Sequence, residues 1–314
     1  MNNSETLLPL SNAIMLDRVE AYDASTLNCY AFRRGSDAIE GHLLSVGNMV
    51  SGFPFALEGV TFQNSECAYI AGMFSRDTDN HHQLQEALRV EANGFIAKKK
   101  IRRFNEDKKR TDWEEFNVQW MLYCVWCKVV NNREFRDMLL AIPSDAVIIE
   151  DSTFQNGATA DIWGAKNATQ RRLVADYKKQ LEAEGHSKVA IKRACDEKRL
   201  GEWRKQGMFV GKNLMGKILM LCRDAVMRGT TPDIDLELLR SKRIYLFGRL
   251  LTFDCIPTVG EAVERVEEAI ILDQEEVYDP KTQNVWPFKR VDDIVEGIKL
   301  DLCNMTSCYP FAVN

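Results

Sequence analysis

The sequence lacks any apolar stretch long enough to cross a membrane, because its most apolar segment, 120–130, is short and is followed by Asn131, Asn132 and Arg133. The first residues also lack the basic start and the apolar centre of a secretion signal. No internal repeat and no low-complexity segment is present. We therefore expect a cytoplasmic protein without a membrane partner.

Metal and disulfide motifs are missing as well. Only four histidines occur, and the adjacent pair His81 and His82 has no cysteine or further histidine at ligand spacing. Neighbouring residues of a helix point about 100° apart, so we interpret the pair as surface histidines and expect neither a metal nor a cofactor. The nine cysteines are an odd number without framework spacing, which is typical of reduced thiols. Cys124 and Cys127 match Cys-x-x-Cys without a second half-site, so core packing is the favoured interpretation.

The composition is that of a folded globular protein, with 45% hydrophobic and 28% charged residues over 314 positions. This length allows one large domain or two ordinary ones. The net charge of −5 argues against a general nucleic-acid binder, but the charges are unevenly distributed. Segment 98–110 holds eight basic and two acidic side chains, 166–205 is a second basic segment, and 261–279 is acidic. Such separation permits local phosphate contacts, although each basic run can equally be a solvated helix face.

Strand patterns are concentrated in the first part of the chain. Segments 19–22 and 27–32 are rich in aromatic and β-forming residues and look like a hairpin. Glu58-Gly59 is a turn signal between two short strands within 49–62. Further elements are expected as helices over 81–92 and 133–141, a strand over 146–151, an inserted, highly charged helical pair over 165–206, an apolar helix over 218–223, and helices over 263–272 and 291–302.

One helix is expected at the centre of the core. Thr111 and Glu114 form a capping-box pattern at its start. The residues that follow, as far as about 130, are apolar on all sides, which is typical of a buried helix.

Glu66 is the first candidate functional residue. Asn64 or Ser65 caps a helix, and Glu66 lies in its first turn, where free backbone N–H groups favour an ionised carboxylate. If it faces a cleft, it is an anion ready to meet positive charge. The alternative is that it only completes the start of the helix.

Two later segments have the character of a site. A strand ending in Glu150 and Asp151 leads through a loop to Asp161 and Trp163, and loops on a rigid frame often carry function. An ordinary loop with a core-packed tryptophan explains the same residues. Further on, Lys212-Asn213 precedes a helix start, where backbone donors can bind an anion, but the spacing is not that of a Walker motif.

Five separated motifs occur in a fixed order: Ser51-Gly52-Phe53-Pro54, Ser65-Glu66, Asp112-Trp113-Glu114, Asp161-Ile162-Trp163-Gly164, and Gly211-Lys212-Asn213 with Gly216. Together they resemble the NADAR domain, also called the YbiA-like family, over about 48–223. The resemblance implies a predominantly helical α+β fold with a small β-sheet, interrupted by the helical insertion over 165–206. Residues 1–47 would then be an N-terminal hairpin or extension, and 224–314 a helical extension packed on the domain.

The activity that the resemblance implies is that of an N-glycosidase. Its members cleave the bond from ribose C1 to an exocyclic amino nitrogen, either of ADP-ribosylated guanine or of a phosphoribosylamino-pyrimidine. Members of the first kind act as antitoxins to DarT-type DNA ADP-ribosyltransferases. By the same resemblance, the catalytic positions fall on Glu66, Asp161, Trp163 and Trp113, and we assign substrate binding to Ser51, Gly52, Phe53, Lys98, Glu150, Lys212, Asn213 and Gly216.

An ionised carboxylate suits the oxocarbenium-like centre of such a reaction, and a second carboxyl group can move protons. We assign the first role to Glu66 and the second to Asp161, although the two can be exchanged. The tryptophans Trp113 and Trp163 would form flat walls for the base or ribose. The helix that begins at Asn213 would hold phosphate.

The chain departs from the family pattern at two positions. Met73 stands where many members have a lysine, for which the basic residues 98–100 can compensate, and Gly52 stands where an asparagine is common. The leading hypothesis is removal of ADP-ribose from guanine in nucleic acid, DNA rather than RNA, with ADP-ribose and a cognate ADP-ribosyltransferase toxin as partners. The alternatives are a metabolic N-glycosidase and a non-catalytic ADP-ribose reader or toxin-neutralising protein.

Overall fold

A computed structural model describes residues 15–259, 277–279 and 284–286 of the chain. The chain divides into two compact units, Met1–Thr258 and Val259–Asn314. In the second unit, strands β12 (Val277–Asp279) and β13 (Asn284–Trp286) pair antiparallel. The helices expected over 263–272 and 291–302 lie outside the described residues.

The core of the first unit is built around α4 (Trp113–Asn131). Because its sequence is apolar on all sides, fourteen of its residues are buried, as predicted. Helix α1 (Ser65–Met73) packs along it, and the Trp120 indole donates a hydrogen bond to the Ala68 carbonyl at 3.2 Å. A Cβ on Gly72 would lie 2.1 Å from the Trp120 indole nitrogen, so glycine is required for this approach. The thiols of Cys124 and Cys127 are free and buried, as expected for core residues.

The strands before α1 form the predicted hairpin. Strand β5 (Phe55–Leu57) pairs antiparallel with β6 (Val60–Phe62). Glu58 and Gly59 between them have φ values of 50° and 78°, the left-handed conformation that a tight two-residue turn requires. The hairpin leads directly to α1.

The N-terminal strands do not form the hairpin expected from 19–22 and 27–32, and that prediction is wrong. Strand β1 (Glu20–Asp23) pairs antiparallel with β9 (Met208–Gly211), whereas β2 (Cys29–Phe32) pairs parallel with β7 (Val147–Glu150). All four residues of β2 are buried, which suits a parallel pair covered on both faces better than a hairpin arm.

The short strands of the first unit form several separate sheets of two or three strands. Strand β8 (Lys166–Asn167) pairs with β9, and a bridge between Asp151 and Ala165 continues from β7 to this edge. The Ala165 amide donates to the Glu150 carbonyl at 2.9 Å, and the Ser152 amide to the Ala165 carbonyl at 3.0 Å. The predicted combination of many helices with a small β-sheet is therefore confirmed.

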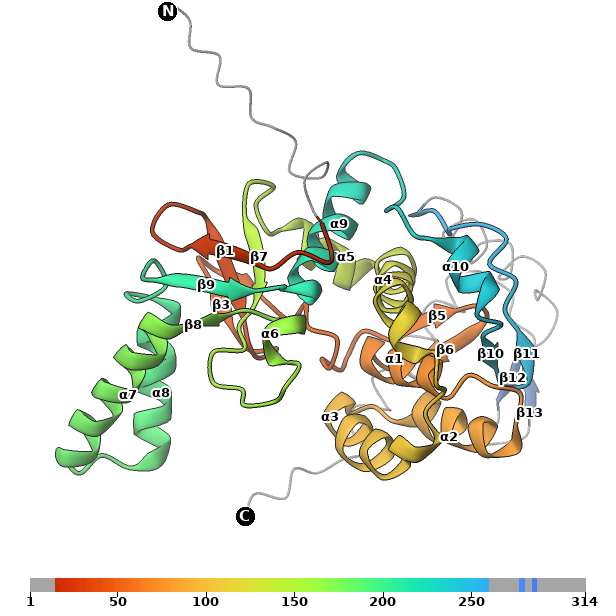
Figure 1. The fold of residues 1–314 in the computed structure, drawn as a ribbon, viewed down its shortest axis with the longest axis horizontal. Helices are drawn as coiled ribbons and strands as arrows, with labels where there is room; N and C mark the ends of the chain where they lie inside the picture. The colour runs from red at the N-terminus through yellow and green to blue at the C-terminus, as the bar shows by residue number, and fades with distance from the viewer. Residues whose placement is uncertain (1–14, 260–276, 280–283, 287–314) are drawn as a thin grey trace, which may run out of the picture. The chain divides into compact units, whose positions relative to one another are not determined.

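Figure 1 shows β1, β7, β9 and α9 (Leu214–Met227) between two groups of helices. Helices α1 and α4 lie on one side, and the hairpin of α7 (Ala168–Ala183) and α8 (Lys188–Leu200) lies on the other. The remaining helical segments are α2 (Asp79–Val90), α3 (Gly94–Ile96), a π-helical turn (Ala97–Arg102), a 3-10 segment (Arg103–Lys108), α5 (Arg133–Leu140), α6 (Ala160–Trp163) and α10 (Leu236–Ser241). The remaining strands are β3 (Ala38–Ile39), β4 (His42–Leu43), β10 (Tyr245–Leu246) and β11 (Arg249–Leu250). Residues 15–47 and 224–258 thus pack in the same unit as 48–223.

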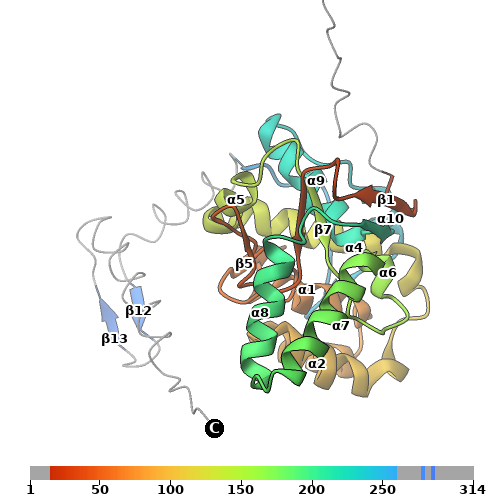
Figure 2. The same ribbon diagram turned by 90° about the vertical axis from the view of Figure 1, so that its left-hand side faces the viewer.

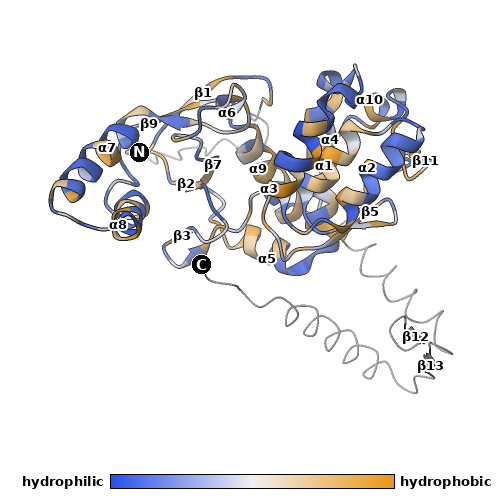
Figure 3. Ribbon diagram, turned by 90° about the horizontal axis from the view of Figure 1, so that it is seen from below, coloured by the Kyte–Doolittle hydropathy of each residue, from blue (hydrophilic) through white to orange (hydrophobic). Residues whose placement is uncertain are grey.

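The charged segment 165–206 forms the predicted helical pair, α7 (Ala168–Ala183) and α8 (Lys188–Leu200). The two helices stand side by side in front of the sheet in Figure 2. Leu181, Ile191 and Cys195 form a small core between them. The outer surface of α7 is largely hydrophilic, as is that of α2, whereas α1 is apolar along most of its length (Figure 3).

Two local predictions are wrong. Asp112, and not Thr111, is the N-cap of α4, and it accepts hydrogen bonds from Arg110 instead of capping the helix. His81 is buried and not at the surface, since its ring accepts a hydrogen bond from the Arg76 amide at 3.0 Å and contacts the Lys108 carbonyl at 2.9 Å. No helix in the described part of the chain is long and apolar enough to cross a membrane.

The buried Lys128 gives a prediction about stability. Its amino group has no hydrogen-bond partner among the described residues and lies 4.0 Å from the centre of the Phe135 ring, and burial lowers its pKa from 10.5 to about 7. The unfolded state therefore binds more protons between these pH values, and stability rises with pH in that window. We expect Lys128→Met to raise the free energy of unfolding at pH 7 by ~2 kcal/mol, with a smaller gain near pH 10.

Urea unfolding at several pH values measures this effect. Lys179→Met, which changes an exposed lysine, is the matched control. A gain for Lys128→Met that is the same at every pH would contradict a cost of burying the charge.

Candidate active site

Glu66 lies in the first turn of α1, as the sequence predicted. Asn64 caps the helix by accepting a hydrogen bond from the Cys67 amide at 2.9 Å. The side chain of Glu66 is 2% exposed. Asn48 holds the residue at two points, because its carbonyl accepts from the Glu66 amide at 3.0 Å and its side-chain amide donates to the Glu66 carboxylate.

The ionisation of Glu66 differs from the expectation. Burial raises its pKa above the usual value, and the nearby Lys98 and Arg102 act in the opposite direction. The preference for the ionised form that its position in a first helical turn suggested is therefore outweighed by desolvation. Such a carboxyl group is sensitive to any charge placed beside it.

Glu150 is the second carboxyl group of the site. It ends β7, and part of its side chain reaches solvent. Its pKa is raised to about 7, mainly by burial and further by the charges of Glu66 and Asp151, while Lys98 lowers it. Glu66 and Glu150 therefore lie within electrostatic reach of each other, and both lie near Lys98.

The cations reach Glu66 from the π-helical turn. Lys98 is exposed and Arg102 is half-buried one turn further on. Gly94, just before this turn, packs directly on α1, and a Cβ there would lie 3.2 Å from the Glu66 Cβ and 2.8 Å from the Met49 Cα. The missing side chain lets the basic segment approach the carboxylate.

Aromatic rings form one side of the site. Tyr69 is one turn after Glu66 on α1, and its pKa is raised by burial and by the charge of Glu66. The Trp163 ring meets it edge-on with the centroids 5.4 Å apart, and the Trp113 ring lies 4.9 Å away. Trp163 is partly exposed, whereas Trp113 is buried, so in this conformation Trp113 supports Tyr69 and only Trp163 can offer a face to a ligand.

Asp161, the expected acid/base residue, is not linked to Glu66 or Glu150 by any described interaction. It is exposed, and its carbonyl accepts a hydrogen bond from the Lys212 amide at 2.8 Å. Its carboxylate is not among the groups that shift the pKa of Glu66 or Glu150. The carboxyl group that the fold brings to Glu66 is that of Glu150.

Asn213 and Gly216 join α9 to β7. Asn213 stands at the start of α9 with a φ of 51°, and its side chain makes no capping hydrogen bond, although an asparagine at this position is expected to make one. Its side chain instead accepts from the Glu150 amide at 3.0 Å and donates to the Ile148 carbonyl at 2.9 Å. A Cβ on Gly216 would lie 2.1 Å from that same carbonyl. Asn213 therefore positions Glu150, and phosphate binding by Asn213 and Lys212 stays a prediction.

The Ser-Gly-Phe segment lies beside the start of α1. Ser51 donates a hydrogen bond to the Ala92 carbonyl, which also accepts from Asn64 at 3.1 Å. Gly52 is exposed with a φ of 95°. Phe53 is buried and meets Phe135 edge-on at 5.6 Å, so it belongs to the core.

Sequence reasoning missed Asn48, Tyr69 and Arg102. Two of them could have been found from helical spacing. Tyr69 follows Glu66 by three residues, and Arg102 follows Lys98 by four, so each pair shares one face of a helix. Asn48 had no such signal, because it comes from a loop. Met73 is fully buried and does not enter the site, whereas Lys98 does supply a positive charge beside Glu66.

The candidate site combines acidic, basic and aromatic side chains. Two carboxyl groups with raised pKa values, two cations and a partly exposed indole come together from α1, β7, the π-helical turn and α6. Among residues 15–259, no group of three or more His, Cys, Asp or Glu side chains is arranged to hold a metal ion. The carboxyl groups and cations can supply general acid/base and electrostatic chemistry.

The raised pKa of Glu150 predicts a pH-dependent cost. The folded state holds an extra proton between the ordinary pKa of 4.5 and about 7, so stability falls as pH rises through this window. We expect Glu150→Gln to be more stable than the wild type by roughly 1 kcal/mol at pH 8 and to lose this advantage below pH 4.5. Chemical denaturation at both pH values measures it, with the exposed Glu134→Gln as control. An equal effect of the two variants would count against a raised pKa of the Glu150 carboxyl group.

No protein-family model and no curated protein matches the sequence. Among solved structures, the NMR structure of the E. coli protein YbiA is similar to the chain, with 20% identity and a TM-score of 0.38. The match covers 65% of this chain and 92% of that one. A similarity at this level does not assign the chain to a family.

Proposed function

We propose that the chain is an N-glycosidase that hydrolyses the bond between ribose C1 and the amino nitrogen of ADP-ribosylated guanine in nucleic acid. The observation that supports this most directly is that the buried Glu66 and the strand-end Glu150 both lie within electrostatic reach of Lys98. The pKa of Glu150 is raised to about 7, so a fraction of this group carries a proton near neutral pH, while Lys98 and Arg102 favour the ionised form of Glu66. One carboxylate and one carboxylic acid are what this reaction requires.

In the proposed mechanism, Glu66 acts as the carboxylate. The amide of Asn48 donates to it, and Lys98 and Arg102 favour its ionised form. As the C1–N bond breaks, its electron pair goes to the amino nitrogen, and positive charge develops at C1 and the ring oxygen. The negative charge of Glu66 stabilises that centre.

Glu150 acts as the acid in this mechanism and takes the role that the sequence suggested for Asp161. With a pKa of about 7, a fraction of Glu150 is protonated at neutral pH and can give its proton to the departing amino nitrogen. Water then adds to C1 and returns a proton to the Glu150 carboxylate. The products are an unmodified guanine and free ADP-ribose.

The surroundings of the carboxyl groups suit this substrate. The partly exposed Trp163 ring can stack on the base. Lys98 and Arg102 can pair with the diphosphate. Lys98 would thereby supply the positive charge that many family members have as a lysine at the position of the buried Met73. The exposed Lys99, Lys100 and Arg103 next to them supply charge for a nucleic-acid backbone. We propose DNA rather than RNA as the substrate and a cognate ADP-ribosyltransferase toxin as a partner.

A second candidate, a non-catalytic ADP-ribose reader or toxin-neutralising protein, is favoured by Met73. Many members of the family that the chain resembles have a lysine at this position. Met73 is fully buried and brings no charge to the site. A reader would bind the modified base through the same aromatic and basic residues and would need no acid.

The first test is mass spectrometry of an ADP-ribosylated guanine oligonucleotide after incubation with the protein. The wild type is expected to remove the ADP-ribose mass, and Glu66→Gln to slow its removal at least ~100-fold, because the amide cannot stabilise the cationic centre. Glu134→Gln, at an exposed position, is the matched control and should retain activity.

The result also separates the alternatives. Binding of the modified oligonucleotide by the wild type without loss of mass would support the reader. Cleavage of a phosphoribosylamino-pyrimidine alone would support the metabolic N-glycosidase. Full activity of Glu66→Gln would show that Glu66 is not catalytic.

Lys98 gives an independent prediction. Lys98→Gln is expected to reduce kcat/KM about tenfold, because it removes a positive charge from beside both carboxyl groups. It should also shift the acidic limb of the pH profile to higher pH, since Lys98 lowers the pKa of Glu66. Lys100→Gln removes an exposed lysine from the same segment and is expected to leave the profile unchanged. Identical pH profiles for the two variants would contradict a role of Lys98 at the carboxyl groups.

A further inference from the structure

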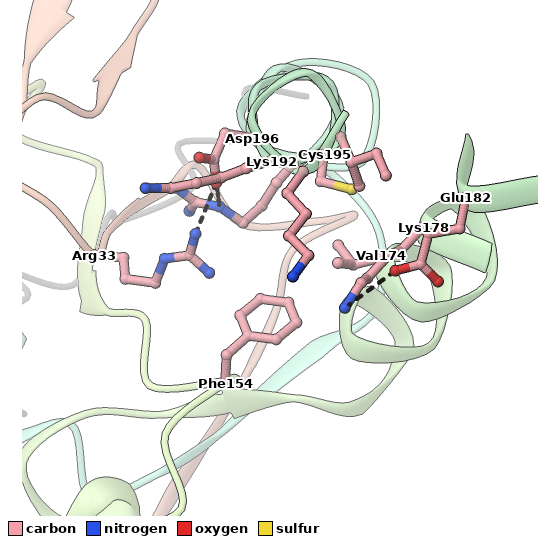
Figure 4. Close-up of a pocket in the computed structure, with 11 residues that line it drawn as sticks. Arg33, Phe154, Val174, Lys178, Glu182, Lys192, Cys195 and Asp196 are labelled. Carbon is pink, nitrogen blue, oxygen red and sulfur yellow. Dashed lines mark hydrogen bonds and ion pairs between the residues drawn. The ribbon is translucent and has the colours of Figure 1, made fainter. Parts of the chain in front are cut away.

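A cavity of about 320 Å³ lies where the α7–α8 hairpin meets the loop that follows β7. Its walls are apolar and come from Val174 on α7, Ile191 and Cys195 on α8, and Phe154 on the loop. Figure 4 shows the Phe154 ring in the middle of this space, between Arg33 on one side and Val174 on the other. The volume falls in the range of small-molecule sites, about 300–1,000 Å³.

The cavity and the candidate active site share one strand end but lie on different sides of it. Successive side chains of a strand point to opposite faces, so Glu150 and Asp151 diverge. Glu150 interacts with Glu66 and Lys98, whereas Asp151 is fully buried and forms an ion pair with Arg199 at 3.2 Å. Arg199 lines the cavity, so the end of β7 connects the two sites.

The acidic groups at the base of the cavity are already paired. Arg199 is 3% exposed and also binds Asp37 at 2.8 Å. Asp196 accepts from Arg33 at 2.7 Å and pairs with Arg34 as well. These pairs fix the floor and leave little negative charge to repel an anion.

The cations at the rim are different. Lys178 pairs with Glu182 at 3.6 Å, but Lys188 and Lys192 form no ion pair with any acid in the part of the chain that the structure describes. Both are exposed at the mouth of the cavity. The Nε of Arg199, on the inside, forms no hydrogen bond with the described residues and lies 3.9 Å from a carboxylate oxygen of Asp196.

We propose that this cavity is a second binding site, for a nucleotide. The base would lie against Phe154, whose ring is already contacted by the Arg33 guanidinium at 5.0 Å, and the phosphate would pair with Lys188 and Lys192. Flat aromatic rings bind bases by stacking without regard to their identity, and lysines bind phosphate. A purely apolar ligand would use the walls but not the two unpaired cations.

A free nucleotide and a nucleotide within a single strand both carry the base and the phosphate that this site would bind. Fluorescence anisotropy with a short, unmodified, labelled single-stranded oligonucleotide measures binding directly, and unlabelled AMP serves as competitor. Because the oligonucleotide carries no ADP-ribose and no turnover is measured, the result is independent of the glycosidase proposal.

The expected result is salt-dependent binding that the cavity residues control. Lys188→Gln/Lys192→Gln is expected to weaken binding about tenfold and to reduce the slope of log K against log salt by about 1.4, which corresponds to two phosphate contacts. Phe154→Leu keeps an apolar side chain but loses the flat ring, and is expected to weaken binding about tenfold. Lys179→Gln/Lys205→Gln removes two exposed lysines outside the cavity and is the matched control.

The two sources and the failure of the proposal give different results. Competition by AMP, reduced by the same substitutions, would show that the site takes free nucleotides. Binding of the strand alone would show that it holds a nucleotide within a chain. No binding by the wild type, or equal affinities for the cavity variants and the control, would overturn the proposal.

Discussion

The parallel pairing of β2 with β7 is the constraint on which both sites depend. Because the carboxyl ends of parallel strands meet at one edge, the pair brings Arg33 and the residues from Glu150 to Phe154 to the same place. The strand alternation then separates Glu150, which meets Glu66, from Asp151, which meets Arg199. Asn213 fixes this strand end by hydrogen bonds to the main chain on either side of Ile149, so α9 also contributes to the position of Glu150.

Burial raises the pKa values of Glu66 and Glu150 in the candidate active site, and the nearby cations offset this effect only in part. Isolated carboxylates would not be stable in such surroundings, and proton uptake relieves the cost. Lys98 and Arg102 reach Glu66 because Gly94 leaves room for the backbone to approach α1. A ligand that brings phosphate to these cations would weaken their stabilisation of the carboxylates and so raise the proton affinity of Glu66 and Glu150.

The errors of sequence reasoning have physical causes that can be identified. The hairpin expected from 19–22 and 27–32 relied on sequence proximity, but a fully buried strand such as β2 gains more from a partner covered on both faces. Asp161 was assigned as the second acid because the resemblance places a family acid there, and that assignment stays a prediction. In the structure the Asp161 carbonyl accepts a hydrogen bond from the Lys212 amide. His81 was assigned to the surface because its partners, the Arg76 amide and the Lys108 carbonyl, are main-chain groups that no motif reveals.

The sequence by itself determined the local elements: the buried helix α4 from its all-round apolar pattern, the β5–β6 turn from Glu58-Gly59, the cap before Glu66, and the charged pair α7–α8. It also singled out Glu66, Lys98, Glu150 and Trp163 as candidates, partly from their places at a helix start, a strand end and a loop, and partly from the family resemblance. Only the tertiary structure decided which of them meet, because their proximity depends on pairing between strands more than one hundred residues apart and on close approaches allowed by Gly94 and Gly216. Long-range contacts of this kind leave no local pattern, and desolvation, which raises the pKa of both glutamates, exists only once those contacts have formed.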